Sequence, residues 1–524
     1  MKGLAITSAV LRAALWTAVA GAGAAAAGPE ARRSGPAKSA RGRGPMVRLF
    51  EACKGSVATY TATRVERKAP ASRPGSGKAG KPVTITHVER GSAFVIHADG
   101  FLLTTSHGLR AEGKRRVKFE DGRSYRVREI ARDDWIDVAL LKVEADRPLK
   151  PLKLGRNEDV MVGERVAVLG DPFGFGVSLG VGYVTGLGRS TKTDFAPLTD
   201  MIQTDAGINP GVSGGPLLNL DGEAIGIGTS RRSGADGIGF ATPIGKALAA
   251  LPAMIDAERR YGFVLGMGVA AVGEAAVVSV AEGGPAAAAG VKVGDVVTAA
   301  DGKAVRRGLD FHLALVDRKG GQKLPLSLRR EGKAVEVTAA LKDVPMRPTD
   351  RPNDIAPGLA YRMFKGRWDR LPDLTKRKPA ATGTMATIGL GPHAGGDRFA
   401  LELTGHIDVP ADGTWMFYLA SDDGSRLHVG RTLVIDHDGL HGMVERRGII
   451  RLRAGKHPIR IEFFEAAGDE GLKASYEGPG LRKRPIPAKA LLHAKPPDKA
   501  HEGAASRRTN KPTESLRKTI GRSG

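Results

Sequence analysis

The stretch TDAGINPGVSGGPLLNLDGEAIGIGTS, residues 204–230, decides the fold of the first half of the chain. Glycines at 211, 214 and 215 surround Ser213 and permit both a positive φ and close approach of another backbone. Short apolar runs follow at 215–219 and 223–229. The stretch therefore predicts two strands preceded by a glycine-rich turn that presents a serine.

Short β-type runs extend from this stretch back to about residue 83. Runs at 83–88 and 91–96 lead into the pair Asp99-Gly100, and 101–105 follows, which is a hairpin signal. Further strands are predicted at 56–64, 115–119, 124–130, 138–143, 164–169, 180–187 and 200–204. Many short strands at such spacing favour a barrel or sandwich, and 244–260 is the helix expected to close this domain.

The composition supports a mainly β protein of several domains. A chain of 524 residues can form two to four domains with their own cores. Its 71 Gly and 31 Pro require many turns, which favours short strands over long helices.

The net charge of +24 has two interpretations. In the first interpretation, the charge attracts the protein to nucleic acid, anionic lipid or acidic cell-wall polymer. In the second, the charge belongs to basic tails exposed to solvent. No compact basic patch interleaved with aromatic residues accompanies the charge, so we expect no specific nucleic-acid partner. Residues 495–524 are predicted to be a basic disordered tail.

The beginning of the chain predicts export. Residues 1–27 combine a basic start at Lys2, a short apolar stretch and a run of small residues, which is typical of a secretory signal peptide. An uncleaved membrane anchor is the alternative, although the charge of Arg12 makes residues 1–27 a poor membrane span. Residues 28–46 are predicted to be a disordered spacer. Cys53 is the single cysteine and is expected to be a small buried hydrophobe, because nothing around it resembles a catalytic thiol motif.

Three segments could combine in nucleophilic catalysis. LLTTSHGL places His107 at a strand end, DDWIDVALLKV places Asp137 ahead of a strand, and Ser213 lies in its turn. A serine needs a base, and the base needs a carboxylate to fix its tautomer. The amides of Gly211 and Ser213 could hold an oxyanion. Each segment alone has an ordinary structural explanation, and the order His, Asp, Ser is what favours a triad.

Residues 85–250 resemble the trypsin-like double-barrel proteases, specifically the HtrA (Deg) branch, through GSAFVIHADGFLLTTSHGL, DMIQTDAGINPGVSGGPLLNLDGEAIGIGTS and GIGFATP. The resemblance implies two perpendicular six-stranded barrels over 47–260, with a cleft between them where peptide bonds are hydrolysed through an acyl-enzyme without a cofactor. Trypsins carry an acidic residue where this chain has Gly207. An apolar pocket formed by Ile238, Gly239 and Phe240 is therefore expected, with cleavage after small or medium apolar residues of unfolded proteins.

The chain departs from the branch at Val212, where Asn is usual before the serine. Valine cannot hydrogen-bond the loop, so we expect the oxyanion turn to be held differently or to be switchable. The alternative function is a catalytically inactive adhesion or scaffold protein that binds glycans through its C-terminal module.

Residues 262–343 resemble a PDZ domain, with LGMGV and GGPAAAAGVKVGDVVTAADGKAV as the matching blocks. The resemblance implies that a peptide adds a strand to an exposed edge and that Gly266, Met267 and Gly268 receive its carboxylate. The alternative is a packing domain without peptide affinity. A linker is predicted at 344–356.

Residues 357–494 resemble the β-sandwich module named after the anthrax protective antigen, from GLAYRMFKG through RPIPAKALL. Such modules often bind glycans, and some use adjacent aspartates to hold Ca²⁺. Asp422 and Asp423 occupy that place, although DDG is also a turn signal. The sequence thus predicts an exported, periplasmic, envelope-associated or secreted serine endopeptidase that acts on polypeptides. The family resemblance also implies a homotrimer and a glycan or cell-wall ligand.

Overall fold

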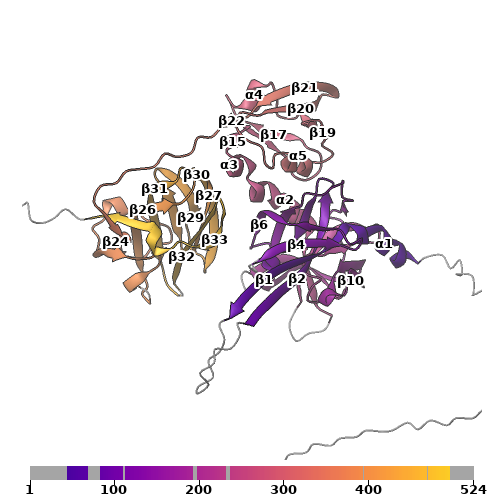
Figure 1. Cartoon of the computed structure of the whole chain (residues 1–524), viewed down its shortest axis with the longest axis horizontal. Helices are drawn as coiled ribbons and strands as arrows, with labels where there is room; N and C mark the ends of the chain where they lie inside the picture. Colours follow the sequence, from indigo (N-terminus) through magenta and orange to yellow (C-terminus); the bar gives the residue numbers. More distant parts are fainter. Residues whose placement is uncertain are drawn as a thin grey trace, which may run out of the picture. The chain divides into compact units, whose positions relative to one another are not determined.

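The computed structural model describes residues 44–68, 83–109, 113–192, 197–231, 237–393, 395–468 and 470–495 (Figure 1). The predicted signal peptide (1–27), most of the spacer (28–46) and the tail after residue 495 lie outside these residues. Within them, no helix is both long and apolar enough to cross a membrane.

The described chain begins with helix α1 (Pro45–Cys53), which starts inside the predicted spacer. The helix forms because Leu49 and Cys53, one turn apart, are buried against the core of the first domain. The Cys53 thiol is buried as predicted, and burial raises its pKa.

Strands β1 to β7 form one sheet in the order β5-β4-β1-β2-β3-β7-β6 within the described residues. Their bounds are β1 Val57–Lys68, β2 Val83–His97, β3 Phe101–Thr104, β4 Lys114–Phe119, β5 Ser124–Arg126, β6 Arg128–Asp133 and β7 Val138–Lys142. The predicted runs 83–88 and 91–96 are one continuous strand, because Gly91 keeps its place opposite Tyr60 in the β1–β2 ladder. The predicted turn at Asp99-Gly100 joins β2 to β3.

Strands β8 to β14 form a second sheet that closes on itself through the pairing of β12 with both β9 and β13. Their bounds are β8 Lys153–Leu154, β9 Arg165–Gly170, β10 Ser178–Lys192, β11 Pro197–Thr204, β12 Pro216–Leu218, β13 Glu223–Arg231 and β14 Gly239–Pro243. Valines of β9 alternate inward and pack with Ile208, Val212 and Leu217 in the core of this barrel. The mainly β fold class is confirmed, but the expected six strands per barrel is wrong, because each of the two sheets has seven strands in the described residues.

The single helix predicted at 244–260 is two helices, α2 (Ile244–Ile255) and α3 (Ala257–Tyr261). Asp256 adopts a left-handed conformation with φ of 42° and separates them. Because left-handed backbone cannot continue a right-handed helix, the chain changes direction at this residue.

The segment predicted as a PDZ domain has short strands and two helices. Their bounds are β15 Phe263–Val264, β16 Met267–Val269, β17 Val277–Val280, α4 Pro285–Ala288, β18 Val296–Ala300, β19 Lys303–Ala304, α5 Gly308–Ala314, β20 Lys323–Arg330, β21 Lys333–Ala340 and β22 Lys342–Asp343. Strands β19-β18-β20-β21 form a sheet, and β16 pairs with β17 alone among the described strands. Phe263, Phe311 and Leu326 are at its buried core.

The last segment is a sandwich of two antiparallel sheets in the described residues. One holds β23 to β26, β28, β29, β31 and β34, and the other has the order β30-β27-β32-β33. Their bounds are β23 Ile355–Pro357, β24 Leu359–Lys365, β25 Ala381–Met385, β26 Phe399–Val409, β27 Gly413–Asp422, β28 Ser425–Val429, β29 Thr432–His437, β30 Val444–Leu452, β31 Gly455–Glu465, β32 Gly471–Gly478, β33 Leu481–Pro485 and β34 Leu491–Ala494. Alternate residues of β27, such as Trp415 and Phe417, fill the core between the sheets. Strand β23 begins inside the predicted linker 344–356.

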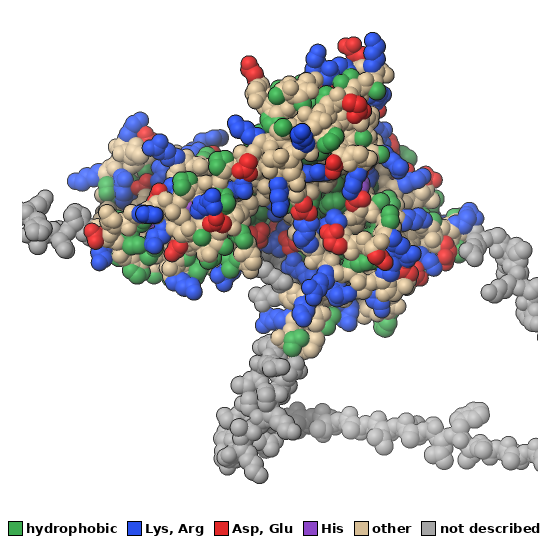
Figure 2. Space-filling model, turned by 45° about the horizontal axis from the view of Figure 1, so that its top comes forward, with side chains coloured by type: hydrophobic (Ala, Val, Ile, Leu, Met, Phe, Trp, Pro, Cys, Tyr) green, Lys and Arg blue, Asp and Glu red, His purple; other side chains and the backbone are tan. Residues whose placement is uncertain are grey.

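Basic side chains are distributed over the face shown in Figure 2, with acidic side chains between them. On this face they do not gather into a single patch of the kind that binds nucleic acid.

Candidate active site

Antiparallel pairing brings His107 and Asp137 together. Thr104 at the end of β3 lies opposite Ala139 near the start of β7, so residues just after β3 meet residues just before β7. The Asp137 carboxylate accepts hydrogen bonds from the His107 backbone N–H at 2.9 Å and from the ring Nδ1 at 2.7 Å. Asp137 is buried and has a φ of 53°. Asp137 therefore fixes the orientation of the imidazole through Nδ1, which is the arrangement a general base at Nε2 needs.

Ser213 lies in a turn between β11 and β12, and its side chain lines the same cleft as His107. This cleft has a volume of about 360 Å³ and is lined by residues of both barrels. The Ser213 Oγ donates a hydrogen bond to the carbonyl of Thr229 on β13 at 2.9 Å. To pass its only proton to His107, the hydroxyl has to give up this bond and rotate about its Cα–Cβ bond.

The turn around Ser213 is held by the backbone and by Ser92 of β2. The Ser92 amide donates to the Ser213 carbonyl at 2.8 Å, and the buried Ser92 Oγ donates to the Gly211 carbonyl at 2.7 Å. Gly214 has a φ of 88°, and a Cβ there would lie 2.1 Å from the Ser92 carbonyl oxygen. Only glycine fits at this position, which explains the SGG sequence.

The side chain of Val212 is buried in the core of the second barrel, where it contacts Gly170. The turn is thus held by Ser92 and by the Gly215 amide, which donates to the Val212 carbonyl at 2.8 Å. A polar residue at position 212 is not needed for this arrangement. The amides of Gly211 and Ser213 donate no hydrogen bond to the described residues, so both are available to an oxyanion.

The predicted specificity pocket differs from the structure. None of Gly207, Ile238, Gly239 and Phe240 lines the cleft, and Phe240 packs on Leu198 and Met201 instead. Ile208 lines the cleft, and its side chain covers Gly239, where an added Cβ would lie 3.1 Å from the Ile208 Cδ1. The sequence gives no sign of the role of Ile208, because the folded turn, and not the spacing of residues along the chain, places its side chain at the cleft.

The predicted PDZ loop holds a carboxylate of the chain itself. The amides of Leu265 and Gly266 both donate to Oε1 of Glu258 at 2.9 Å. Gly266 has a φ of 73°, whereas Met267 and Gly268 already belong to β16. The loop amides that meet a carboxylate are therefore those of Leu265 and Gly266, of which Gly266 belongs to the predicted set and Leu265 precedes it by one position.

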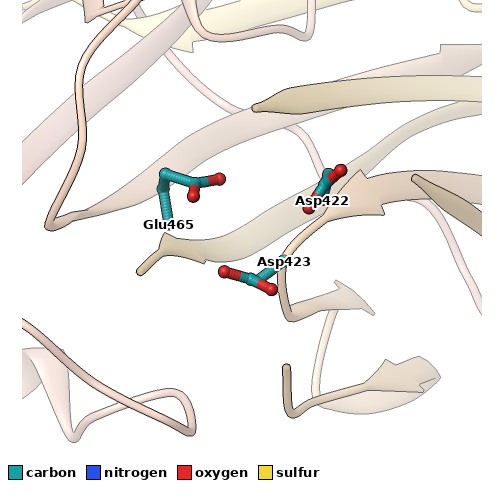
Figure 3. Close-up of side chains that lie close together, drawn as sticks. All are labelled: Asp422, Asp423 and Glu465. Carbon is teal, nitrogen blue, oxygen red and sulfur yellow. The ribbon is translucent and has the colours of Figure 1, made fainter. Parts of the chain in front are cut away.

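Asp422 and Asp423 lie beside a third carboxylate, Glu465, at the end of β31 (Figure 3). Ligand oxygens of the three residues lie within 4.8 Å of one another. Asp423 accepts from the amides of His441 and Ala466, both at 3.0 Å.

Glu465 is fully buried, and neither of its carboxylate oxygens has a hydrogen-bond partner among the residues that the structure describes. Burial raises the pKa of Glu465 to about 7, and the nearby Asp423 and Asp422 add to the effect. The sequence carried a signal for this residue, because Glu465 shares the inward face of β31 with Phe463.

Three family models match the chain. The trypsin-like peptidase domain matches residues 91–227, the PDZ domain 224–341 and the PA14 domain 356–490. A protein of Pseudomonas fulva (strain 12-X) named probable periplasmic serine endoprotease DegP-like is 36% identical over 285 residues, which cover 51% of this chain and 59% of the relative. A Chlamydia trachomatis protein of the same name is 33% identical over 273 residues, which cover 49% of this chain and 54% of the relative.

The chain therefore spans little more than half the length of these curated relatives. Among solved structures, the HtrA-type protease AlgW with a decapeptide is 27% identical, covering 57% of this chain and 98% of its own, at a TM-score of 0.36.

Proposed function

We propose that this chain, which is of the HtrA type in carrying a trypsin-like peptidase domain followed by a PDZ domain, is a serine endopeptidase with Ser213, His107 and Asp137 as its triad. The observation that carries the proposal is that His107, hydrogen-bonded to the buried Asp137, lines one cleft with a serine held in a glycine turn.

The reaction follows from the roles of these groups. The Ser213 Oγ bonds to the substrate carbonyl carbon while its proton passes to Nε2 of His107, and Asp137 stabilises the resulting imidazolium. The carbonyl electron pair moves to oxygen, where the amides of Gly211 and Ser213 stabilise the negative charge. When the C–N bond breaks, the leaving amine takes the proton from His107. Water then repeats the sequence on the acyl-enzyme and frees Ser213.

Ile208 favours small side chains before the cleaved bond. It fills the space over Gly239, so a long or basic side chain has little room there. The absence of an acid at Gly207 leaves a basic side chain without a counter-charge. Unfolded polypeptides are the substrate class, because folded proteins bury most small apolar residues.

The location and assembly of the protein are also proposals. The relatives are named periplasmic, and residues 1–27 have the pattern of a signal peptide, which supports export to the periplasm or envelope. A homotrimer is proposed from the family resemblance, and sedimentation velocity of the purified chain tests it.

Hydrolysis of unfolded casein tests the catalytic proposal. Ser213→Ala is expected to lower turnover by on the order of 10⁴ to 10⁶. Ser178→Ala is the matched control, because its hydroxyl makes one exposed hydrogen bond, to Gly176. Equal turnover by wild type and Ser213→Ala would contradict the proposal. No hydrolysis by either protein would favour the alternative, an inactive scaffold that binds glycans.

We further propose that the sandwich binds Ca²⁺ through Asp422, Asp423 and Glu465. A fully buried carboxylate without partners, next to two others, is costly unless a cation neutralises it. Carboxylate oxygens are the ligands that Ca²⁺ prefers. The bound ion would give the module a place where sugar hydroxyls could complete the coordination, which is the basis for proposing a glycan or cell-wall ligand.

Calorimetric titration of the full chain with CaCl₂ tests this site. Glu465→Gln is expected to abolish the binding heat, because it removes a ligand charge that has no hydrogen-bonding role. Asp408→Asn, the same change at an acid on β26 outside the three-carboxylate cluster, should leave the heat unchanged. Equal heat from wild type and Glu465→Gln would exclude this site, and glycan binding that survives chelation would exclude calcium from sugar recognition.

A further inference from the structure

The entrance to the PDZ segment contains an anion-binding nest that is occupied. Two successive amides, those of Leu265 and Gly266, converge on the single oxygen Oε1 of Glu258 at 2.9 Å. Converging backbone N–H groups of this kind bind carboxylates, including the C-terminal carboxylate of a peptide. The occupant comes from α3, only seven and eight residues earlier in the chain.

The edge of β16 next to this nest is also engaged. The Gly266 carbonyl accepts a hydrogen bond from the Ala281 amide, and the Ala270 amide donates one to the Ala276 carbonyl, so residues 266 and 270 face β17. Because neighbouring residues of a strand face opposite edges, the amide and carbonyl of Val269 face the edge away from β17. A peptide strand added at that edge would need the Val269 carbonyl as an acceptor. His312 of α5 already bonds this carbonyl through its Nε2 at 2.9 Å.

We infer that the chain closes its own peptide groove, with Glu258 in the place of a peptide C-terminal carboxylate. Peptide binding then requires Glu258 to leave the nest, and His312 to release Val269 where the peptide strand extends that far. The inference rests on the proposed function of the PDZ segment in binding peptides. It adds an internal competitor and thus a means of regulating substrate capture.

Both ends of the helix that carries Glu258 have a left-handed backbone conformation. Helix α3 is bounded by left-handed residues at both ends, Asp256 with φ of 42° and Gly262 with φ of 72°. Such residues at element ends are places where a hinge rotation can occur. A groove closed for nine-tenths of the time lowers the apparent peptide affinity roughly ten-fold.

Fluorescence polarisation with labelled decapeptides tests the inference. The probes end in Ala, Val, Leu or Phe, each with a free or an amidated C-terminus, and Ser213→Ala is present throughout to prevent cleavage. Adding Glu258→Ala should tighten binding of free-carboxylate probes about ten-fold or more, and Glu258→Gln should act in the same direction. Glu282→Gln, the same charge change at an exposed position of the neighbouring turn, should alter the affinity by less than about two-fold.

The outcomes separate the inference from the function on which it rests. Equal affinity with and without Glu258, still dependent on a free carboxylate, would overturn the closed groove and leave peptide recognition standing. Weaker binding in both Glu258 variants would show that Glu258 supports the loop, and would also overturn it. Binding in no variant would overturn the inference and peptide recognition together. Unfolding midpoints of all variants show whether each one is folded.

Discussion

Removal of the Ser92 hydroxyl tests whether this residue holds the catalytic turn. In Ser92→Ala, the Asp171 amide loses its acceptor at 3.0 Å and the Gly211 carbonyl loses its donor at 2.7 Å. Ser92 is fully buried, so water cannot replace the hydroxyl. Each buried unpaired group costs about 1–3 kcal/mol, which gives a loss in unfolding free energy of about 2–4 kcal/mol after relaxation.

The same change should lower turnover more than it changes KM. The Ser92 hydroxyl holds the carbonyl of Gly211, and the amide of Gly211 is one of the two proposed to bind the oxyanion. Without the hydroxyl, this amide is positioned less firmly, and stabilisation of the transition state is weaker. Loss of one oxyanion donor costs about 10²–10³ in kcat, and partial loosening should cost about ten- to a hundred-fold. Urea unfolding and casein kinetics measure the two effects, with Ser178→Ala as control. A kcat within two-fold of wild type, or an unfolding free energy within about 0.5 kcal/mol, would refute the reasoning.

Two further changes test the triad and the pocket. Asp137→Asn should lower kcat by about 10⁴, because the amide favours the wrong imidazole tautomer. The residual activity is measured by casein hydrolysis sampled over several days. A loss in kcat below about ten-fold would argue against the role of Asp137. Ile208→Ala should open the space over Gly239 and raise kcat/KM for Leu relative to Ala before the cleaved bond by about 10- to 100-fold, at a cost of about 2–4 kcal/mol in stability. A peptide series that differs only at that residue measures the ratio, and an unchanged ratio would place the pocket elsewhere.

Much of the first domain could be predicted because its signals are local. Alternating apolar runs and glycine turns predict the strands, and antiparallel pairing of two such strands brings His107 to Asp137. The helix break at Asp256 was not predictable, because left-handed backbone at an aspartate leaves no mark in an otherwise helical pattern. The predicted pocket residue Phe240 failed for a related reason, since the side of the sheet it faces depends on tertiary packing.

The carboxylates outside the triad show the same limit. Glu258 lies in an ordinary charged helix, and only the folded loop shows that it meets two amides. Glu465 had a local signal, an acid on the inward face of an apolar strand, but its neighbours Asp422 and Asp423 come from a different strand end. The family resemblance therefore pointed to two of these three acids, and only the fold adds the third.

Labelling with a fluorophosphonate, followed by peptide mass spectrometry, tests the central claim most directly. The Ser213 Oγ should displace fluoride and carry a single phosphonyl adduct, because only a serine activated by a base reacts at an appreciable rate. The adduct should be absent from Ser213→Ala and strongly reduced in His107→Ala. An unlabelled Ser213 in the folded wild-type chain, or an adduct that forms equally without His107, would contradict the assignment of this chain as a serine endopeptidase.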